Sequence, residues 1–197
     1  LGGNPRMAAA GSQLMIVSGG SLYCYNGATL NAVNYFDDHT SKLPQFSAVA
    51  VLYNIFVYSV VNSNQFYFSS VGDGTVINAA NFSAAQTDPS PIVEIAVLAE
   101  EILFFKSTAV EYWDYNGQLT APFALSQGRT YIRGCAAQNS VVKLDNALFW
   151  VADDLTIYRT SSVPQSVSTP FITDRLNAAQ STIAQRSEEH TSELQSH

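Results

Sequence analysis

The sequence predicts an all-β protein, a β-propeller built of four-stranded blades, and three observations lead to this fold class. Charged residues make up only 13% of the 197 residues, whereas Tyr, Phe, Ser, Asn, Thr and Val, which favour strands and turns, are abundant. Apolar runs recur with a period of roughly 44 residues. Each period contains four runs separated by short polar turns, which is the layout of one propeller blade.

The first run of each repeat is unbroken and apolar, which is typical of an inner strand buried on both faces. These first runs are 46–52, 92–98 and 140–144. The second runs start at Leu14, Ile55, Ile102 and Ala147, with spacings of 41, 47 and 45 residues. The third runs are rich in aromatic residues and alternate more, as expected nearer the blade exterior. They start at Leu22, Phe66, Val110 and Thr156, with spacings of 44, 44 and 46 residues.

A weaker fourth run completes each repeat. These fourth runs are 29–35, 75–82, 122–128 and 164–169. Helical periodicity appears only at 173–185, where Leu176, Ala179 and Ile183 share one side.

The four repeats fill residues 1–185, which we expect to form one β-propeller domain of about four blades. Propellers have four to eight blades, and the chain begins at Leu1 rather than Met. We therefore expect a fragment truncated at one or both ends. A β-sandwich is the alternative fold, because strands and turns recur at short intervals in any all-β chain.

The last twelve residues, 186–197, are polar and lack periodicity. Their sequence, RSEEHTSELQSH, is what a common sequencing-adapter oligonucleotide encodes when it is read in frame. We therefore expect a non-native tail on a metagenomic fragment, and without it the chain has 8 basic and 13 acidic residues, a net charge of −5 instead of −7. No function is assigned to the titratable residues of this tail, which include Glu188, Glu189, His190, Glu193 and His197.

The stretch Gly72-Asp73-Gly74 falls between the third and fourth runs of its repeat. Asp-Gly pairs are strong hairpin signals because their residues accept positive φ. A calcium loop would need further oxygen ligands at alternate positions, and a phosphate-binding loop would need a longer glycine spacing and a lysine. We therefore interpret Asp73 as a turn residue.

Two further acidic clusters are candidate sites. Asp37, Asp38 and His39 are adjacent in the sequence, and neighbours on an extended chain point in opposite directions, so they do not converge on a metal ion. Asp153 and Asp154 lie between the second and third runs of the last repeat, and paired carboxylates are catalytic only when they face each other across a cleft. We interpret both clusters as solvated loops and predict no catalytic, cofactor-binding or metal-binding residues.

The remaining residues give no enzyme signature. His39 is the single histidine outside the tail, and neither a Ser-His-Asp nor a Cys-His set can be built around it. Tyr112, Trp113 and Tyr115 could form an exposed stacking platform, but aromatic residues at alternate strand positions more commonly serve blade packing. The protein is therefore predicted not to be an enzyme and to need no cofactor.

Composition also excludes two classes of partner. No run of 18 apolar residues exists, so we expect no transmembrane helix and no membrane partner. The nine Lys and Arg residues are scattered, so no basic face for sequence-specific binding of nucleic acid is predicted. Cys24 and Cys135 are far apart, and we interpret them as buried free thiols.

An ordered set of five phrases connects the chain to a known family. The phrases are FYFSSVGDGT with NAANFSAAQTDPSPIVEIAVL, EILFFKSTAVEYWDYNG, PFALSQG, RGCAAQNSVVKLDNALFWVADD and IYRTSSVPQSVSTPFI. Their order and spacing, from about Gly11 to Leu176, resemble the packaged-DNA stabilisation proteins of short-tailed bacteriophages, also called tail accessory factors or tail hubs. The chain departs from the family pattern at three places. The family usually has Trp where this chain has Val76 and Ile77, and it often has Glu where this chain has Gln86. The family favours Gly at the position of Lys106.

The resemblance implies a phage tail protein of the virion that is assembled in the bacterial host cytoplasm. Such proteins form a ring of copies below the portal protein, close the exit channel, hold the packaged DNA before its ejection, and dock the tail needle or spike proteins. An acidic chain is compatible with a channel through which DNA slides, because an acidic lining repels phosphate.

Two alternatives remain open. A glycan-binding or polysaccharide-hydrolysing propeller would carry several carboxylates around the propeller axis, and Glu94 and Asp145 are the acids nearest the predicted inner strands. The other alternative is a propeller scaffold for an unknown protein partner.

Overall fold

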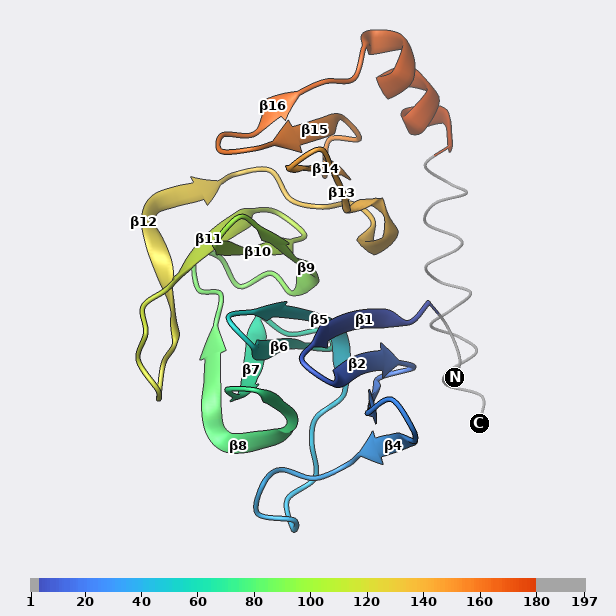
Figure 1. The fold of residues 1–197 in the computed structure, drawn as a ribbon. Helices are drawn as coiled ribbons and strands as arrows, with labels where there is room; N and C mark the ends of the chain where they lie inside the picture. The colour runs from blue at the N-terminus through green and yellow to red at the C-terminus, as the bar shows by residue number, and fades with distance from the viewer. Residues whose placement is uncertain (1–3, 180–197) are drawn as a thin grey trace. The chain divides into compact units, whose positions relative to one another are not determined.

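The structure, a computed structural model, describes residues 4–179. The chain divides into two compact units, Leu1–Gly134 and Cys135–His197, and each unit is described by itself. Within the described residues, the first unit contains three four-stranded antiparallel sheets and the second contains one (Figure 1). In every sheet the strands pair in sequence order, which is the connectivity of a propeller blade. The predicted fold class, a β-propeller of four-stranded blades, is confirmed.

We number the blades in chain order. Blade 1 consists of β1 (Arg6–Ala10), β2 (Gln13–Ser18), β3 (Ser21–Tyr25) and β4 (Leu30–Val33). Blade 2 consists of β5 (Phe46–Leu52), β6 (Ile55–Val60), β7 (Gln65–Ser70) and β8 (Asp73–Ala84). Blade 3 consists of β9 (Ile92–Leu98), β10 (Glu101–Lys106), β11 (Val110–Tyr115) and β12 (Phe123–Tyr131).

The first strands of these three blades are innermost. β5 packs against both β1 and β9, so the inner strands of the first unit lie side by side. The predicted burial of the first runs on both faces holds for β5 and β9, in which most side chains are buried. β1 falls outside the predicted runs, because its short sequence RMAAA begins with a charge and its alternate side chains are exposed.

Blade 2 has apolar side chains on both faces because it lies between two other blades. Along β6, Phe56 and Tyr58 join a core shared with blade 1, whereas Ile55 and Val57 join a core shared with blade 3. Neighbouring residues on a strand point to opposite faces, so a strand covered on both sides needs an unbroken apolar run. The second strands are therefore as buried as the first.

The core between blades 1 and 2 and the core between blades 2 and 3 are distinct. The first contains Met15, Val17, Leu22 and Cys24 of blade 1 with Phe46, Phe56, Tyr58 and Ile77 of blade 2. The second contains Ala48, Ile55, Val57, Phe66 and Phe68 of blade 2 with Ile95, Ile102, Phe104 and Trp113 of blade 3. Phe66 stacks on Phe104 with ring centroids 4.4 Å apart, so aromatic contacts join blades 2 and 3 directly.

The second unit contains blade 4 and a helical segment. Blade 4 consists of β13 (Val142–Leu144), β14 (Ala147–Val151), β15 (Ile157–Thr160) and β16 (Gln165–Ser166), preceded by the 3-10 turn η1 (Gln138–Ser140). The prediction that the first run is buried on both faces is wrong for β13, because its three side chains are exposed. The reason is that only three residues pair here and the central one is the charged Lys143.

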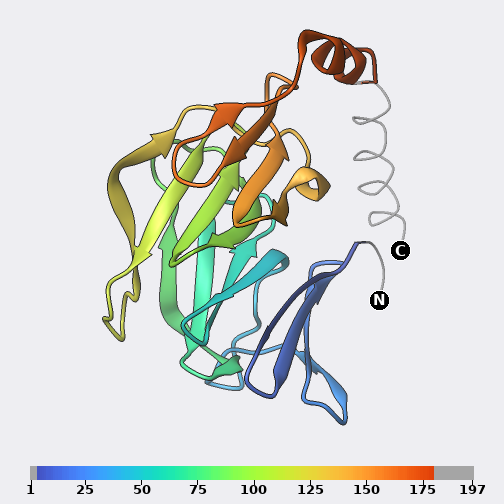
Figure 2. The ribbon, with the colours of Figure 1, turned by 45° about the horizontal axis from the view of Figure 1, so that its top comes forward.

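The predicted helix is present in part. Residues 170–179 are helical and follow β16 (Figure 2), so the helix begins earlier than predicted. The predicted helical positions 180–185 and the predicted tail 186–197 lie outside the described residues. Among the described residues, no helix has the length and apolar character needed to cross a membrane.

Candidate functional site: polar joints between the blades

Three sets of polar side chains connect the blades of the first unit, and the first is built on the turn that holds Asp73. Gly72 has a φ of +79°, which glycine adopts without strain, and Asp73 begins β8. Asp73 Oδ1 accepts hydrogen bonds from the Thr75 amide at 2.9 Å and from the Thr75 hydroxyl at 2.7 Å. These bonds within the loop are the turn chemistry that the sequence predicts.

The same turn also binds a side chain of blade 1. Gln13 Nε2 donates to Asp73 Oδ1 at 2.9 Å, and the Gly74 amide donates to Gln13 Oε1 at 2.7 Å. Burial raises the pKa of Asp73, but the hydrogen bonds from Gln13 and Thr75 outweigh burial and hold this pKa below its ordinary value. The sequence gives no sign of this joint, because Gln13 is an ordinary polar residue at the start of a strand.

Gly74 allows blades 1 and 2 to approach closely at this joint. A Cβ at Gly74 would lie 2.7 Å from Met15 Cγ and 2.9 Å from Phe56 Cδ2, both shorter than real carbon contacts. The Gly74 carbonyl accepts a 2.7 Å hydrogen bond from the hydroxyl of Tyr58, which is fully buried. The second glycine of Gly72-Asp73-Gly74 is thus required by packing, whereas the first is required by backbone conformation.

The second joint pairs Arg6 of blade 1 with Glu94 of blade 3. Arg6 Nε lies 2.7 Å from Glu94 Oε2, and the Ile95 amide donates to Glu94 Oε1 at 2.9 Å. Because β5 lies between β1 and β9, this ion pair connects two inner strands that are not adjacent. Glu94 is 6% exposed, and burial raises its pKa to about 7 against the lowering effects of Arg6 and the Ile95 amide.

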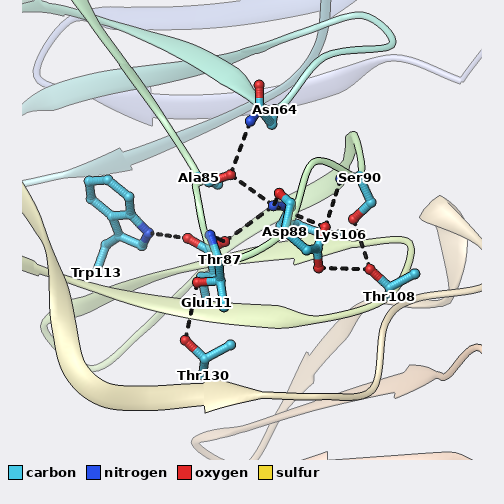
Figure 3. Close-up of polar contacts among 10 residues, drawn as sticks. All are labelled: Asn64, Ala85, Thr87, Asp88, Ser90, Lys106, Thr108, Glu111, Trp113 and Thr130. Carbon is cyan, nitrogen blue, oxygen red and sulfur yellow. Dashed lines mark hydrogen bonds and ion pairs between the residues drawn. The ribbon is translucent and has the colours of Figure 1, made fainter.

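The third joint surrounds Lys106, the last residue of β10, whose side chain is fully buried (Figure 3). Lys106 Nζ donates to the Ala85 carbonyl at 2.8 Å and to the Asp88 carbonyl. The same nitrogen lies 3.2 Å from Glu111 Oε1 and 3.3 Å from Asp88 Oδ1. Since residues 85 and 88 belong to the connection from blade 2 to blade 3, the lysine attaches this connection to the β10–β11 hairpin.

Further donors hold the two carboxylates of this joint in place. Glu111 Oε1 accepts from the Thr87 amide at 3.0 Å, and Glu111 Oε2 accepts from Trp113 Nε1 at 3.1 Å. Asp88 accepts from the Ser90 amide at 2.7 Å and from the Thr108 hydroxyl at 2.7 Å. Burial raises the pKa of Asp88, but the hydrogen bonds from Ser90 and Thr108 and the Lys106 charge outweigh burial and lower this pKa to about 2.

The acidic cluster at 37–39 forms a local turn. Asp38 Oδ1 accepts from the amides of Thr40 and Ser41, both at 2.8 Å, and hydrogen bonds from these two residues lower the pKa of Asp38 to about 2. Asp37 Oδ2 accepts from Asn78 Nδ2 at 2.9 Å. His39 is exposed, with a φ of +56°. The structure therefore does not bring these three side chains together on one ligand.

The candidate acids of blade 4 also lie in turns. Asp154 Oδ1 accepts from the Thr156 amide at 3.0 Å, and Asp154 Oδ2 accepts from the Tyr158 hydroxyl at 3.2 Å, next to the exposed Asp153. Asp145 has a φ of +47° in the turn between β13 and β14. Asp145 and Glu94 belong to different units of the chain.

The three aromatic residues of β11 divide between core and surface. Tyr112 and Trp113 are 2% and 6% exposed, whereas Tyr115 is 37% exposed. The Tyr115 ring lies 4.6 Å, centroid to centroid, from that of Tyr53, which is 44% exposed in the β5–β6 turn. Tyr112 and Trp113 are thus buried in the blade, with Trp113 in the core shared by blades 2 and 3, and the exposed pair formed by Tyr115 includes a residue that sequence reasoning missed.

Cys24 and Cys135 are buried free thiols, as predicted. Within residues 4–179, no group of three or more His, Cys, Asp or Glu side chains is arranged to hold a metal ion.

Comparisons with known proteins identify a family and a fold. The family model described as Phage_stabilise, Bacteriophage P22 Gp10, beta-propeller, matches residues 2–196. A search of curated protein sequences found no match.

Among solved structures, the extracellular domain of the hybrid two-component system BT4673 from B. thetaiotaomicron is similar, with a TM-score of 0.54 and 13% sequence identity. That match covers 83% of this chain and 22% of the other. YCF48 from Cyanidioschyzon merolae is similar with a TM-score of 0.49 and 12% identity, over 88% of this chain and 61% of the other. This chain thus spans less than two thirds of each of these structures, and at such identities the first likeness shows the fold alone.

Proposed function

Because this chain belongs to the family described as Phage_stabilise, Bacteriophage P22 Gp10, beta-propeller, it is a phage β-propeller stabilisation protein of the virion, and we propose that it assembles as a ring below the portal. In that position it closes the tail channel, holds the packaged DNA, and docks the tail needle or spike proteins. Assembly takes place in the bacterial host cytoplasm. We further propose that it is not an enzyme.

The observation that carries this proposal is the family match along nearly the whole chain, together with the use of the buried charges. Glu94, Lys106 and Glu111, the charged residues that are buried in the described part of the chain, all belong to joints between blades. Side chains engaged in this way hold blades in fixed positions and do not act on a substrate. A set of blades joined by both apolar cores and buried charges is a suitable scaffold for a subunit of a ring.

The acidic balance of the chain is compatible with a channel through which DNA slides. With a net charge of −7, or −5 without residues 186–197, the protein repels DNA phosphates at long range. DNA can then slide past the ring during ejection without being bound by it.

The test is the mass of the protein without residues 186–197, which we expect to be non-native, measured alone and after mixing with portal rings of the same phage. The expected result is a soluble protein that joins portal rings with their symmetry. A protein that never binds portal rings, at any concentration at which both remain soluble, would overturn the proposal.

Glycan binding is a second candidate function, and the exposed pair of Tyr53 and Tyr115 favours it, because aromatic faces stack on sugar rings. Hydrolysis is less well supported, since a glycosidase needs two carboxyl groups facing each other across the substrate and Glu94 is instead paired with Arg6. Retention of host surface polysaccharide by the wild type, lost in Tyr53→Ser and Tyr115→Ser, would support glycan binding. Equal behaviour of the wild type and both variants would reject it.

A further inference from the structure

The Lys106 ammonium is surrounded by oxygen atoms in the manner of a bound metal ion (Figure 3). Two backbone carbonyls, of Ala85 and Asp88, and two carboxylate oxygens, from Asp88 and Glu111, contact or face Nζ, at 2.8 to 3.3 Å where the contact is of ordinary length. Backbone carbonyls and Asp or Glu carboxylates are the ligands that Ca²⁺ takes in proteins. We call these four oxygens the Lys106 cage.

The cage holds more negative charge than the lysine supplies in positive charge. The carboxylates of Asp88 and Glu111 contribute two negative charges, and the ammonium contributes one positive charge. The side chains of Lys106 and Glu111 are fully buried, so water screens their charges weakly, whereas that of Asp88 is 25% exposed and is screened in part. A divalent ion would neutralise both carboxylates, whereas a monovalent ion would leave one charge uncompensated, as the lysine does.

The two carboxylates of the cage also have hydrogen-bond donors other than the lysine. Trp113 and the Thr87 amide fix the Glu111 carboxylate, while the Ser90 amide and Thr108 fix that of Asp88. Outer hydrogen bonds of this kind orient the ligands of metal sites. Removal of the ammonium therefore leaves both carboxylates held by other donors, and the Ala85 carbonyl keeps a 3.3 Å hydrogen bond from Asn64 Nδ2.

We propose that the Lys106 cage is a built cation site that the chain fills with its own ammonium, and that shortening this side chain to alanine converts it into a Ca²⁺ site. Lys106→Ala removes three methylene groups and the ammonium, which leaves room for an ion and for water molecules to complete its coordination. Ca²⁺ fits better than Mg²⁺, because Ca²⁺ accepts irregular oxygen sets at about 2.3–2.6 Å, whereas Mg²⁺ requires near-octahedral ligands at about 2.0–2.1 Å.

Trp113 provides a local readout for this site. Its indole nitrogen donates to Glu111, a cage ligand, at 3.1 Å. Tb³⁺ occupies Ca²⁺ sites, and an indole this close transfers excitation energy to it. The experiment measures terbium luminescence on tryptophan excitation in the full-length protein, followed by displacement with Ca²⁺ and by titration calorimetry with Ca²⁺.

The expected result is that Lys106→Ala binds one Ca²⁺ per chain with sensitised terbium emission, and that the wild type does not. Two matched variants locate the site. Lys106→Met fills the volume without supplying a charge, and the double variant Lys106→Ala with Glu111→Gln removes one of the two negative charges of the cage, so both are expected to lose the emission. A folded Lys106→Ala protein that binds no Ca²⁺, or emission retained in both matched variants, would overturn the proposal.

Thermal unfolding keeps the test decisive if the alanine variant folds poorly. Ca²⁺ at about 100-fold above its Kd is expected to raise the Tm of Lys106→Ala by roughly 5–10 °C, and to leave the wild-type Tm unchanged, since the ammonium occupies the cage. A variant that unfolds in chelator but refolds with Ca²⁺ supports the proposal. A variant that remains unfolded under both conditions, or a wild-type Tm that rises as much as that of the variant, contradicts it.

Discussion

Glu94 shows how burial and an ion pair act against each other on one side chain. Its pKa lies at about 7 in the folded protein, above the ordinary value of 4.5, because burial disfavours the charged form more than Arg6 favours it. The folded state therefore binds a proton more tightly than the unfolded chain does. The stability contributed by this proton is complete below pH 4.5 and is lost as the pH rises through 7.

We predict from this that the free energy of unfolding of the wild type falls by about 1–3 kcal/mol between pH 5 and pH 8 relative to that of Glu94→Gln. The glutamine variant keeps the shape of the side chain and has no proton to lose. The measurement is urea denaturation of both proteins at several pH values, which cancels the titration of groups they share. Parallel pH profiles for the two proteins would show that Glu94 does not titrate in this range.

At the scale of the element, the β10–β11 hairpin depends on the Lys106 joint. Lys106 and Glu111 lie on the two strands of this hairpin, and both are fully buried. Removing one member of such a pair leaves a buried charge with too few partners, which costs far more than breaking an ion pair on the surface.

Glu111→Ala is therefore predicted to lower the free energy of unfolding by about 3–5 kcal/mol. The Thr87 amide loses its acceptor in this variant, so its hydrogen exchange is expected to accelerate more than that of amides in the strands. Thr130→Ala is the matched control, because its 3.3 Å contact with the Thr87 hydroxyl is exposed and its loss should change stability by less than about 0.5 kcal/mol. Equal stability of the two variants would refute a structural role for the buried pair.

Most elements could be predicted from sequence because strand patterns are local. A run such as ILFF in β10 is apolar for a reason that lies within its own repeat, namely burial on both faces of a blade. Exposed and short strands, such as β1 and β13, depart from this rule, and the sequence pattern therefore misses β1 and overstates the burial of β13.

The polar joints could not be predicted in the same way, because they connect residues that are far apart in the chain. Gln13 and Asp73 are 60 residues apart, and no spacing rule links them. Lys106 alone carried a usable signal, since a lysine that directly follows the apolar run ILFF stands where the strand is still buried. A charge in that position calls for a partner of opposite sign, although the sequence does not reveal which one.

At the scale of the whole molecule, the sign of the net charge decides whether the protein binds DNA. Binding to the phosphate backbone needs clustered basic residues that release counterions, and this chain has 9 basic against 16 acidic residues. Of the basic side chains, those of Arg6, Lys106 and Arg129 are paired with carboxylates.

The protein is therefore predicted to leave duplex DNA unshifted in a gel at about 50 mM salt and micromolar concentration, conditions that favour non-specific binding. The same should hold for single-stranded DNA. Retarded bands that disappear at higher salt would reveal a basic surface formed only on assembly, and would contradict the proposed non-adhesive channel.

The two-sided burial of β6 has a consequence for synthesis on the ribosome. One face of blade 2 can be covered as soon as it emerges, because blade 1 precedes it, but the other face needs β9 to β12, as far as Phe123, which contacts Phe68. At translation rates of about 5–20 residues per second, the roughly 40 residues that follow β8 take a few seconds to appear. During that interval the nascent chain displays a sheet of Ile55, Val57, Phe66 and Phe68 side chains to the cytosol. We therefore expect chaperones to bind this intermediate, because one apolar face of the blade is still uncovered. We also expect inclusion bodies to form when translation is fast.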